Sequence, residues 1–122
     1  LAHDLRASVA GVILSLGQMK IADLSESDFR RIVVAYEPVW AIGTGLVAEP
    51  AQIGEAHRFC RAQITKQLGA KAANMRLLYG GSVKAANAAE IFKIDCVDGA
   101  LVGGASLRFE DFSPIIEALE TA

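Results

Sequence analysis

The chain has 122 residues, a formal net charge of −2 and 52% hydrophobic residues. This length suits one compact domain, and the composition excludes a disordered chain. The near-neutral charge argues against nucleic acid or an anionic membrane as a partner bound through bulk charge. No apolar run approaches the roughly 20 residues of a membrane-spanning helix. Cys60 and Cys96 form neither a CxxC motif nor a disulfide framework, which favours a reducing, cytoplasmic compartment.

The first segment, residues 1–16, carries an apolar stripe at helical spacing and predicts a helix that ends near Gly17. This pattern is typical of the middle of a helix, and the first methionine is Met19. We therefore expect the sequence to be part of a longer chain. Ser25 and Asp28 then fit a capping box, which predicts a short helical turn.

Three strand–loop–helix units follow, and their order predicts an α/β fold with parallel strands. The expected strands are residues 32–36, 75–79 and 98–102, and the expected helices are residues 50–68, 87–93 and 110–119. The first strand is an unbroken β-favouring run, typical of a strand buried on both faces. Pro50 suits the first turn of its helix. The inner stripe of that helix is expected to comprise Ile53, Ala56, Cys60, Ile64 and Leu68.

The chemically suggestive residues all lie just after the expected strands, where ligands bind in parallel α/β folds. Glu37 follows the first strand and precedes Pro38. Partial removal of water from such a carboxylate makes it a stronger base, so Glu37 is a candidate general base. The alternative is a solvated carboxylate at the end of a strand. His57 is expected to be a packed or surface histidine rather than a ligand, and no cluster has metal-ligand spacing.

The loop after Glu37 combines stiff and flexible parts. Pro38 fixes one end, Gly43 and Gly45 permit unusual backbone conformations, and Trp40 and Ile42 add apolar bulk. This composition fits a lid that closes over a ligand and excludes water. It equally fits a static loop whose tryptophan packs on the surface.

Two glycine pairs occupy equivalent places in successive units. Gly80-Gly81-Ser82 and Gly103-Gly104 each follow a strand and precede a helix. Backbone N–H groups in such loops can converge on an anion without lysine or arginine. A phosphate group is the expected ligand.

These segments together resemble the triosephosphate isomerase family. Residues 35–45 (AYEPVWAIGTG) resemble the catalytic-base and lid segment, and residues 79–82 (YGGS) and 101–106 (LVGGAS) resemble the next two phosphate-side loops. The resemblance implies that residues 1–122 are one partial domain, the C-terminal portion of a (β/α)₈ TIM barrel with one helix followed by three β/α units. It implies an isomerase that interconverts dihydroxyacetone phosphate and glyceraldehyde 3-phosphate through an enediolate, in glycolysis and gluconeogenesis.

The resemblance also implies roles for residues. Glu37 would be the base, and Gly43, Ser82, Gly103 and Gly104 would bind the substrate phosphate. Ile42 and Leu101 would press on the base. The lid and its latch would comprise Pro38, Val39, Trp40, Ala41, Ile42, Thr44, Gly45, Ala48 and Tyr79, with Ser82 also holding the closed lid. The family implies no cofactor or metal ion, a triose phosphate as partner and a cytoplasmic homodimer for the full-length protein.

The sequence departs from the family in two ways. The second lid hinge has Leu46-Val47-Ala48 where the family usually has Lys-Thr-Ala, which is expected to alter the opening of the lid. A full barrel needs roughly 250 residues, and no counterpart of the family's substrate-binding Asn and Lys or electrophilic His is found. We therefore expect negligible isomerase activity and two open sheet edges in the isolated chain. Alternatives are another phosphate-binding barrel, or a fragment that retains only phosphate binding or a scaffolding role.

Overall fold

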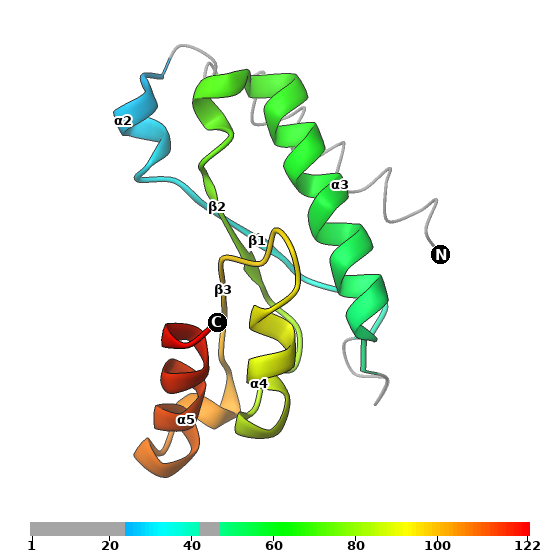
Figure 1. Ribbon diagram of the computed structural model, residues 1–122, viewed down its shortest axis with the longest axis vertical. Helices are drawn as coiled ribbons and strands as arrows, with labels where there is room; N and C mark the ends of the chain where they lie inside the picture. Colours follow the sequence, from blue (N-terminus) through cyan, green and yellow to red (C-terminus); the bar gives the residue numbers. More distant parts are fainter. Residues whose placement is uncertain (1–23, 42–46) are drawn as a thin grey trace.

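The computed structural model describes residues 24–41 and 47–122, and the helix expected over residues 1–16 lies outside them. Strands and helices alternate in the described part as the sequence predicts (Figure 1). The elements are α2 (Glu26–Phe29), β1 (Val33–Tyr36), α3 (Pro50–Leu68), the 3₁₀ helix η2 (Ala70–Ala72), β2 (Arg76–Tyr79), α4 (Ala85–Phe92), β3 (Gly99–Ala100), the 3₁₀ helix η3 (Gly104–Ser106) and α5 (Phe109–Glu120).

The three strands form one parallel sheet in the order β1-β2-β3. Tyr36 is paired with Tyr79, and Tyr79 is paired with Ala100. This register aligns the carboxyl ends of the strands at one edge of the sheet. The loops that follow the strands therefore begin side by side, which is the arrangement a shared ligand site needs.

β3 is shorter than the strand expected over residues 98–102. Its ladder nevertheless continues at both ends, because the Asp98 N–H donates to the Leu77 carbonyl at 2.9 Å and the Leu101 N–H donates to the Tyr79 carbonyl at 2.9 Å. The boundaries of two helices also shift slightly: α4 begins at Ala85 rather than 87, and α5 begins at Phe109 rather than 110. The loop after β3 contains η3, a tight turn that the sequence analysis did not predict.

α3 packs its predicted stripe against the sheet. Pro50 is the first residue of this helix, and all five stripe residues are buried: Ile53, Ala56, Cys60, Ile64 and Leu68. Burial raises the pKa of the Cys60 thiol to about 11, which identifies Cys60 as an inert core residue. Ser25 caps α2 with the predicted capping box, and its hydrogen bond to Asp28 lowers the pKa of that carboxyl.

One face of the sheet is open in the described structure. The prediction that the first strand is buried on both faces is wrong here, since Val33 is 48% exposed and Ala35 is also exposed. Val34 and Tyr36 alternate with them and pack into the core on the other face. The reason is that α3 and α4 cover a single face, and no described element covers the second.

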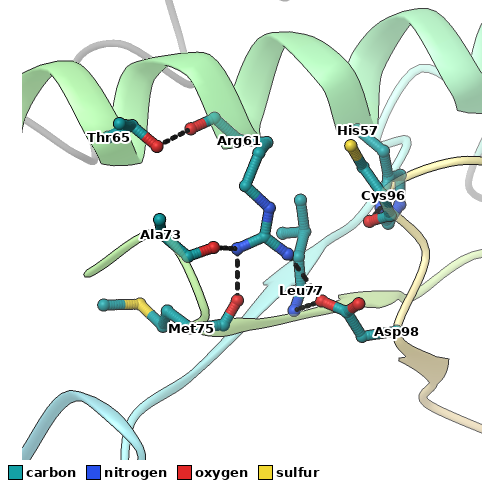
Figure 2. A network of polar contacts seen from close by, with 8 residues as sticks. All are labelled: His57, Arg61, Thr65, Ala73, Met75, Leu77, Cys96 and Asp98. Atoms are coloured by element: carbon teal, nitrogen blue, oxygen red, sulfur yellow. Dashed lines mark hydrogen bonds and ion pairs between the residues drawn. The ribbon is translucent and has the colours of Figure 1, made fainter. Parts of the chain in front are cut away.

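A polar network ties α3 to the amino ends of β2 and β3 (Figure 2). The Arg61 guanidinium donates to the carbonyl of Ala73 at 2.9 Å and to that of Met75, and it pairs with the Asp98 carboxylate at 2.6 Å. The same carboxylate accepts the Leu77 N–H at 2.8 Å. Three chain segments that are distant in sequence are thereby fixed to one side chain.

His57 lies next to this network and is completely buried. Its Nδ1 lies 3.0 Å from the carbonyl oxygen of Cys96, and its Nε2 has no partner within the described residues. Its ring packs against those of Tyr36 and Tyr79. Burial lowers the pKa of the His57 imidazole, so the ring is neutral and donates from Nδ1. This confirms the expectation of a packed histidine.

Candidate functional site

A cleft of about 760 Å³ opens at the carboxyl ends of the strands. It lies between the loops that follow β2 and β3 and the first turn of α4. Its lining consists of Glu37, Gly80, Gly81, Ser82, Val83, Lys84, Ala85, Ala86, Leu101, Val102, Gly103, Gly104, Ala105 and Asp111. The structure thus brings together five residues chosen from the sequence: Glu37, Ser82, Leu101, Gly103 and Gly104.

Glu37 is held at the cleft by the backbone of the neighbouring strand. The N–H of Gly80 donates to the Tyr36 carbonyl at 2.8 Å, which extends the β1–β2 ladder to the residue before the carboxylate. A Cβ on Gly80 would lie 2.7 Å from Glu37 Cγ and 3.6 Å from Leu101 Cδ1. A side chain larger than that of glycine at position 80 would therefore displace Glu37, and Leu101 lies beside the same position.

The expected partial burial of Glu37 is not found, because its side chain is exposed in the described structure. Ile42, the second member of the expected clamp, lies outside the described residues. Leu101 is itself 43% exposed. The Glu37 carboxylate could lose water only if another segment covered both Glu37 and Leu101.

Three backbone donors at the cleft have no partner in the part of the chain that the structure describes. Among the described residues, the N–H groups of Ser82, Gly103 and Gly104 have no backbone acceptor. Carbonyl groups beside them are already engaged, since Gly103 O accepts both the N–H and the hydroxyl of Ser106, at 2.9 and 2.6 Å. A site with free donors and occupied acceptors favours an anion.

The charged side chains of the lining are Glu37, Lys84 and Asp111. Lys84 belongs to the loop between Ser82 and α4, on the glycine-loop side of the cleft. It is the one cation among the described lining residues. The sequence analysis missed Lys84, since a single lysine after a glycine pair carries no pattern of its own.

The loop expected to be a lid is described only at its ends. Pro38 is buried, Val39 is 66% exposed, and Trp40 packs against the core. The Ala41 N–H donates to the Pro38 carbonyl at 2.8 Å, so the segment leaves β1 in a tight turn. The expected lid residues Ile42, Gly43, Thr44 and Gly45 lie outside the described residues.

Ala48, at the far end of this loop, lines the same pocket as the predicted latch residues Tyr79 and Ser82. This second pocket, of about 230 Å³, lies beside the cleft. Tyr79 lies against the glycine loop so closely that a Cβ on Gly81 would be 2.1 Å from its hydroxyl oxygen. The structure therefore places three of the expected latch residues around one pocket.

Other kinds of site find no support in the described part of the chain. No group of three or more His, Cys, Asp and Glu side chains could hold a metal ion among residues 24–41 and 47–122. Within the same residues, no helix combines the length and the hydropathy needed to cross a membrane.

The comparisons with known proteins agree on one family. The family model for triosephosphate isomerase matches residues 6–119. A triosephosphate isomerase from Ruegeria pomeroyi is 62% identical over 96 residues, which are 78% of this chain and 38% of the relative. One from Idiomarina loihiensis is 50% identical over 109 residues, which are 89% of this chain and 43% of the relative.

A solved structure gives the same result. The crystal structure of triosephosphate isomerase from Bartonella henselae is similar with a TM-score of 0.68 and 41% identity, over 75% of this chain and 36% of that one. The chain thus spans about two fifths of the length of the curated relatives it matches. Its open, three-stranded parallel sheet is the corresponding part of a TIM barrel, as predicted.

Proposed function

The chain belongs to the triosephosphate isomerase family, and from that premise we propose that it supplies the base and the phosphate-binding loops of a triose phosphate isomerase site. The reaction is the interconversion of dihydroxyacetone phosphate and glyceraldehyde 3-phosphate. One observation supports the proposal: Glu37 lines the same cleft as Ser82, Gly103 and Gly104, whose N–H groups have no acceptor within residues 24–41 and 47–122.

In this proposal Glu37 moves the proton. Its carboxylate takes a proton from the carbon beside the substrate carbonyl and returns one to the neighbouring carbon, with an enediolate between the two steps. Gly80 leaves space for the Glu37 side chain at the end of β1. Leu101 and Ile42 would cover the carboxylate when the lid closes, which removes water and strengthens the base.

The phosphate is bound by the two glycine loops of the cleft. The N–H groups of Ser82, Gly103 and Gly104, joined by that of Gly43 from the lid, donate to its oxygens. Residues 38–48 form the lid, with Tyr79 and Ser82 holding it closed near Ala48. Enclosure of the phosphate keeps the enediolate from losing it to solvent.

The catalytic groups of this chain are incomplete by themselves. The family's substrate-binding Asn and Lys and its electrophilic His have no counterpart at the strand ends of this sequence, so the enediolate oxygen lacks its stabilising partners. We expect the isolated chain to have negligible isomerase activity. The active form would be a full-length cytoplasmic homodimer in glycolysis and gluconeogenesis.

A chimera tests the proposal directly. The segment of the Ruegeria pomeroyi relative that matches this chain is replaced by this chain's residues, and isomerase activity is measured in both directions. We expect an active chimera whose kcat falls about 10²- to 10⁴-fold on Glu37→Gln, the usual contribution of a general base. Glu110→Gln, which removes an exposed carboxylate on α5 outside the cleft lining, is the matched control.

Two results would contradict the proposal. One is full activity of the Glu37→Gln chimera, which would remove Glu37 from the reaction. The other is an unchanged rate for the folded chimera in the presence of inorganic phosphate at concentrations that inhibit the relative, which would remove the anion site.

A further inference from the structure

The turn between the first glycine pair of the cleft, Gly80-Gly81, and α4 is held by one side chain. Asn87 Oδ1 accepts the N–H of Lys84 at 2.8 Å, and Asn87 Nδ2 donates to the carbonyl of Ser82 at 3.1 Å. Both ends of the segment from Ser82 to Lys84 are thereby fixed to the same amide. Val83, between them, is anchored in the core with 5% exposure.

Asn87 makes these contacts from behind the cleft. It lines the pocket of about 230 Å³ and is absent from the lining of the cleft itself. In a trans peptide the Ser82 C=O points away from the Val83 N–H, and the Ser82 N–H belongs to the preceding peptide. Because Asn87 lines the other pocket, its bond to the Ser82 carbonyl keeps that oxygen from pointing into the cleft, where it would repel an anion.

Half of this arrangement is ordinary helix capping. Asn87 is the third residue of α4, and its bond to the Lys84 N–H satisfies one of the free donors of the helix start. A carboxylate at this position serves that purpose equally well. The bond to the Ser82 carbonyl is different, because only the amide NH₂ can make it, and it does nothing for the helix.

We propose that Asn87 is a positioning residue for anion binding, which fixes the Ser82–Lys84 turn so that the Ser82 N–H and the Lys84 ammonium meet the phosphate together. This inference rests on the function proposed above and deepens it. Asn87 touches neither the substrate nor the reacting atoms and acts through Ser82 and Lys84. The site gains a donor and a charge that are oriented before the ligand arrives, which lowers the ordering cost of binding.

The variants Asn87→Asp and Asn87→Ala separate this role from helix capping. Asp retains the acceptor for Lys84 N–H and suits the first turn of a helix, but it cannot donate to Ser82. Ala removes both bonds. If Asn87 serves only the helix, Asp should behave as the wild type does. If it positions the loop, both variants should weaken phosphate binding about tenfold, the usual worth of one hydrogen bond.

The probe is inorganic phosphate. Its dissociation constant is measured by amide NMR shifts of the 122-residue chain, and its inhibition constant is measured with the chimera. The negative charge that Asp introduces is controlled in two ways: by measurement at about 0.5 M salt, which screens it, and by Ala89→Asp, which places the same charge on an exposed position of α4. Thermal unfolding is recorded for every variant.

The outcomes separate this inference from the proposed function. Weaker phosphate binding by Asn87→Asp at high salt, with unfolding temperature unchanged and Ala89→Asp normal, supports the positioning role. Wild-type phosphate binding retained by Asn87→Asp overturns it and leaves the proposed function intact. If wild-type residues bind phosphate in neither the chain nor the chimera, both fail.

Discussion

The two ends of the sheet are built in opposite ways. At the amino ends of β2 and β3, the Arg61 guanidinium, the Asp98 carboxylate and backbone groups satisfy one another (Figure 2). At the carboxyl ends, the N–H groups of Ser82, Gly103 and Gly104 have no acceptor among the described residues, and Glu37 is exposed. At the amino ends the polar groups stabilise the fold, and at the carboxyl ends they are available to a ligand. Substitutions at the two ends should therefore affect different quantities.

The largest expected effect is on the free energy of unfolding, and it concerns the amino ends of β2 and β3. Arg61→Met removes the donor of two carbonyl groups and leaves the Asp98 carboxylate without its cation. The Arg61 side chain is only 20% exposed, so we expect a loss of about 3 kcal/mol in the free energy of unfolding. Urea unfolding of the chimera measures it, with the exposed Arg58→Met as control. The comparison fails if the loss is below about 1 kcal/mol, or if kcat of the folded enzyme falls as well.

Gly80→Ala at the cleft is expected to lower the rate of the reaction rather than the free energy of unfolding. The new Cβ would lie 2.7 Å from Glu37 Cγ, so the carboxylate must move. A misplacement of about 1 Å in a catalytic group typically costs about 100-fold in rate. The change in rate is measured by steady-state kinetics of the chimera. Ala89→Ser, on the exposed face of α4, is the control. A rate within threefold of the parent would show that Glu37 does not depend on Gly80.

The pattern of the sequence was enough for the fold and for part of the cleft. Periodicity located α3 and its buried stripe, and strand ends located Glu37 and both glycine loops. It could not locate Arg61, Asp98 or Asn87, because their roles depend on partners that the fold brings together. It also misjudged β1, since an apolar run reports what the side chains prefer and not which face is covered. The family resemblance supplied roles that neither spacing nor composition contains.

A smaller effect concerns the histidine between the two ends. The pKa of His57 is lowered by burial, so above its unfolded value of about 6.5 both states are neutral and the folded protein has its full stability. As pH falls below that value, the unfolded state binds a proton that the folded state refuses. Stability should decline by up to about 1.4 kcal/mol per pH unit until the lower folded pKa is reached.

Unfolding by urea at a series of pH values between 7 and 5 measures this decline. His57 and His3 are the only histidines, so His3→Gln is the matched control and should retain the slope. The charged and titratable groups around His57 are Asp98, Arg61, Tyr36 and Tyr79. If His3→Gln abolished the decline of stability with falling pH, His3 rather than His57 would be its cause.

The smallest effect sharpens the comparison at the turn before β3. Cys96 holds a φ of 65°, a conformation that costs an L residue about 1–2 kcal/mol and glycine little. Its carbonyl is fixed there by His57 Nδ1, so the fold imposes the strain to satisfy a buried histidine. Cys96→Gly should raise the free energy of unfolding by about 0.5 kcal/mol, once the added freedom of the unfolded chain is subtracted. Cys96→Ala keeps the strain and removes the thiol, so an equal gain in both variants would show that the thiol, and not the backbone, carries the cost.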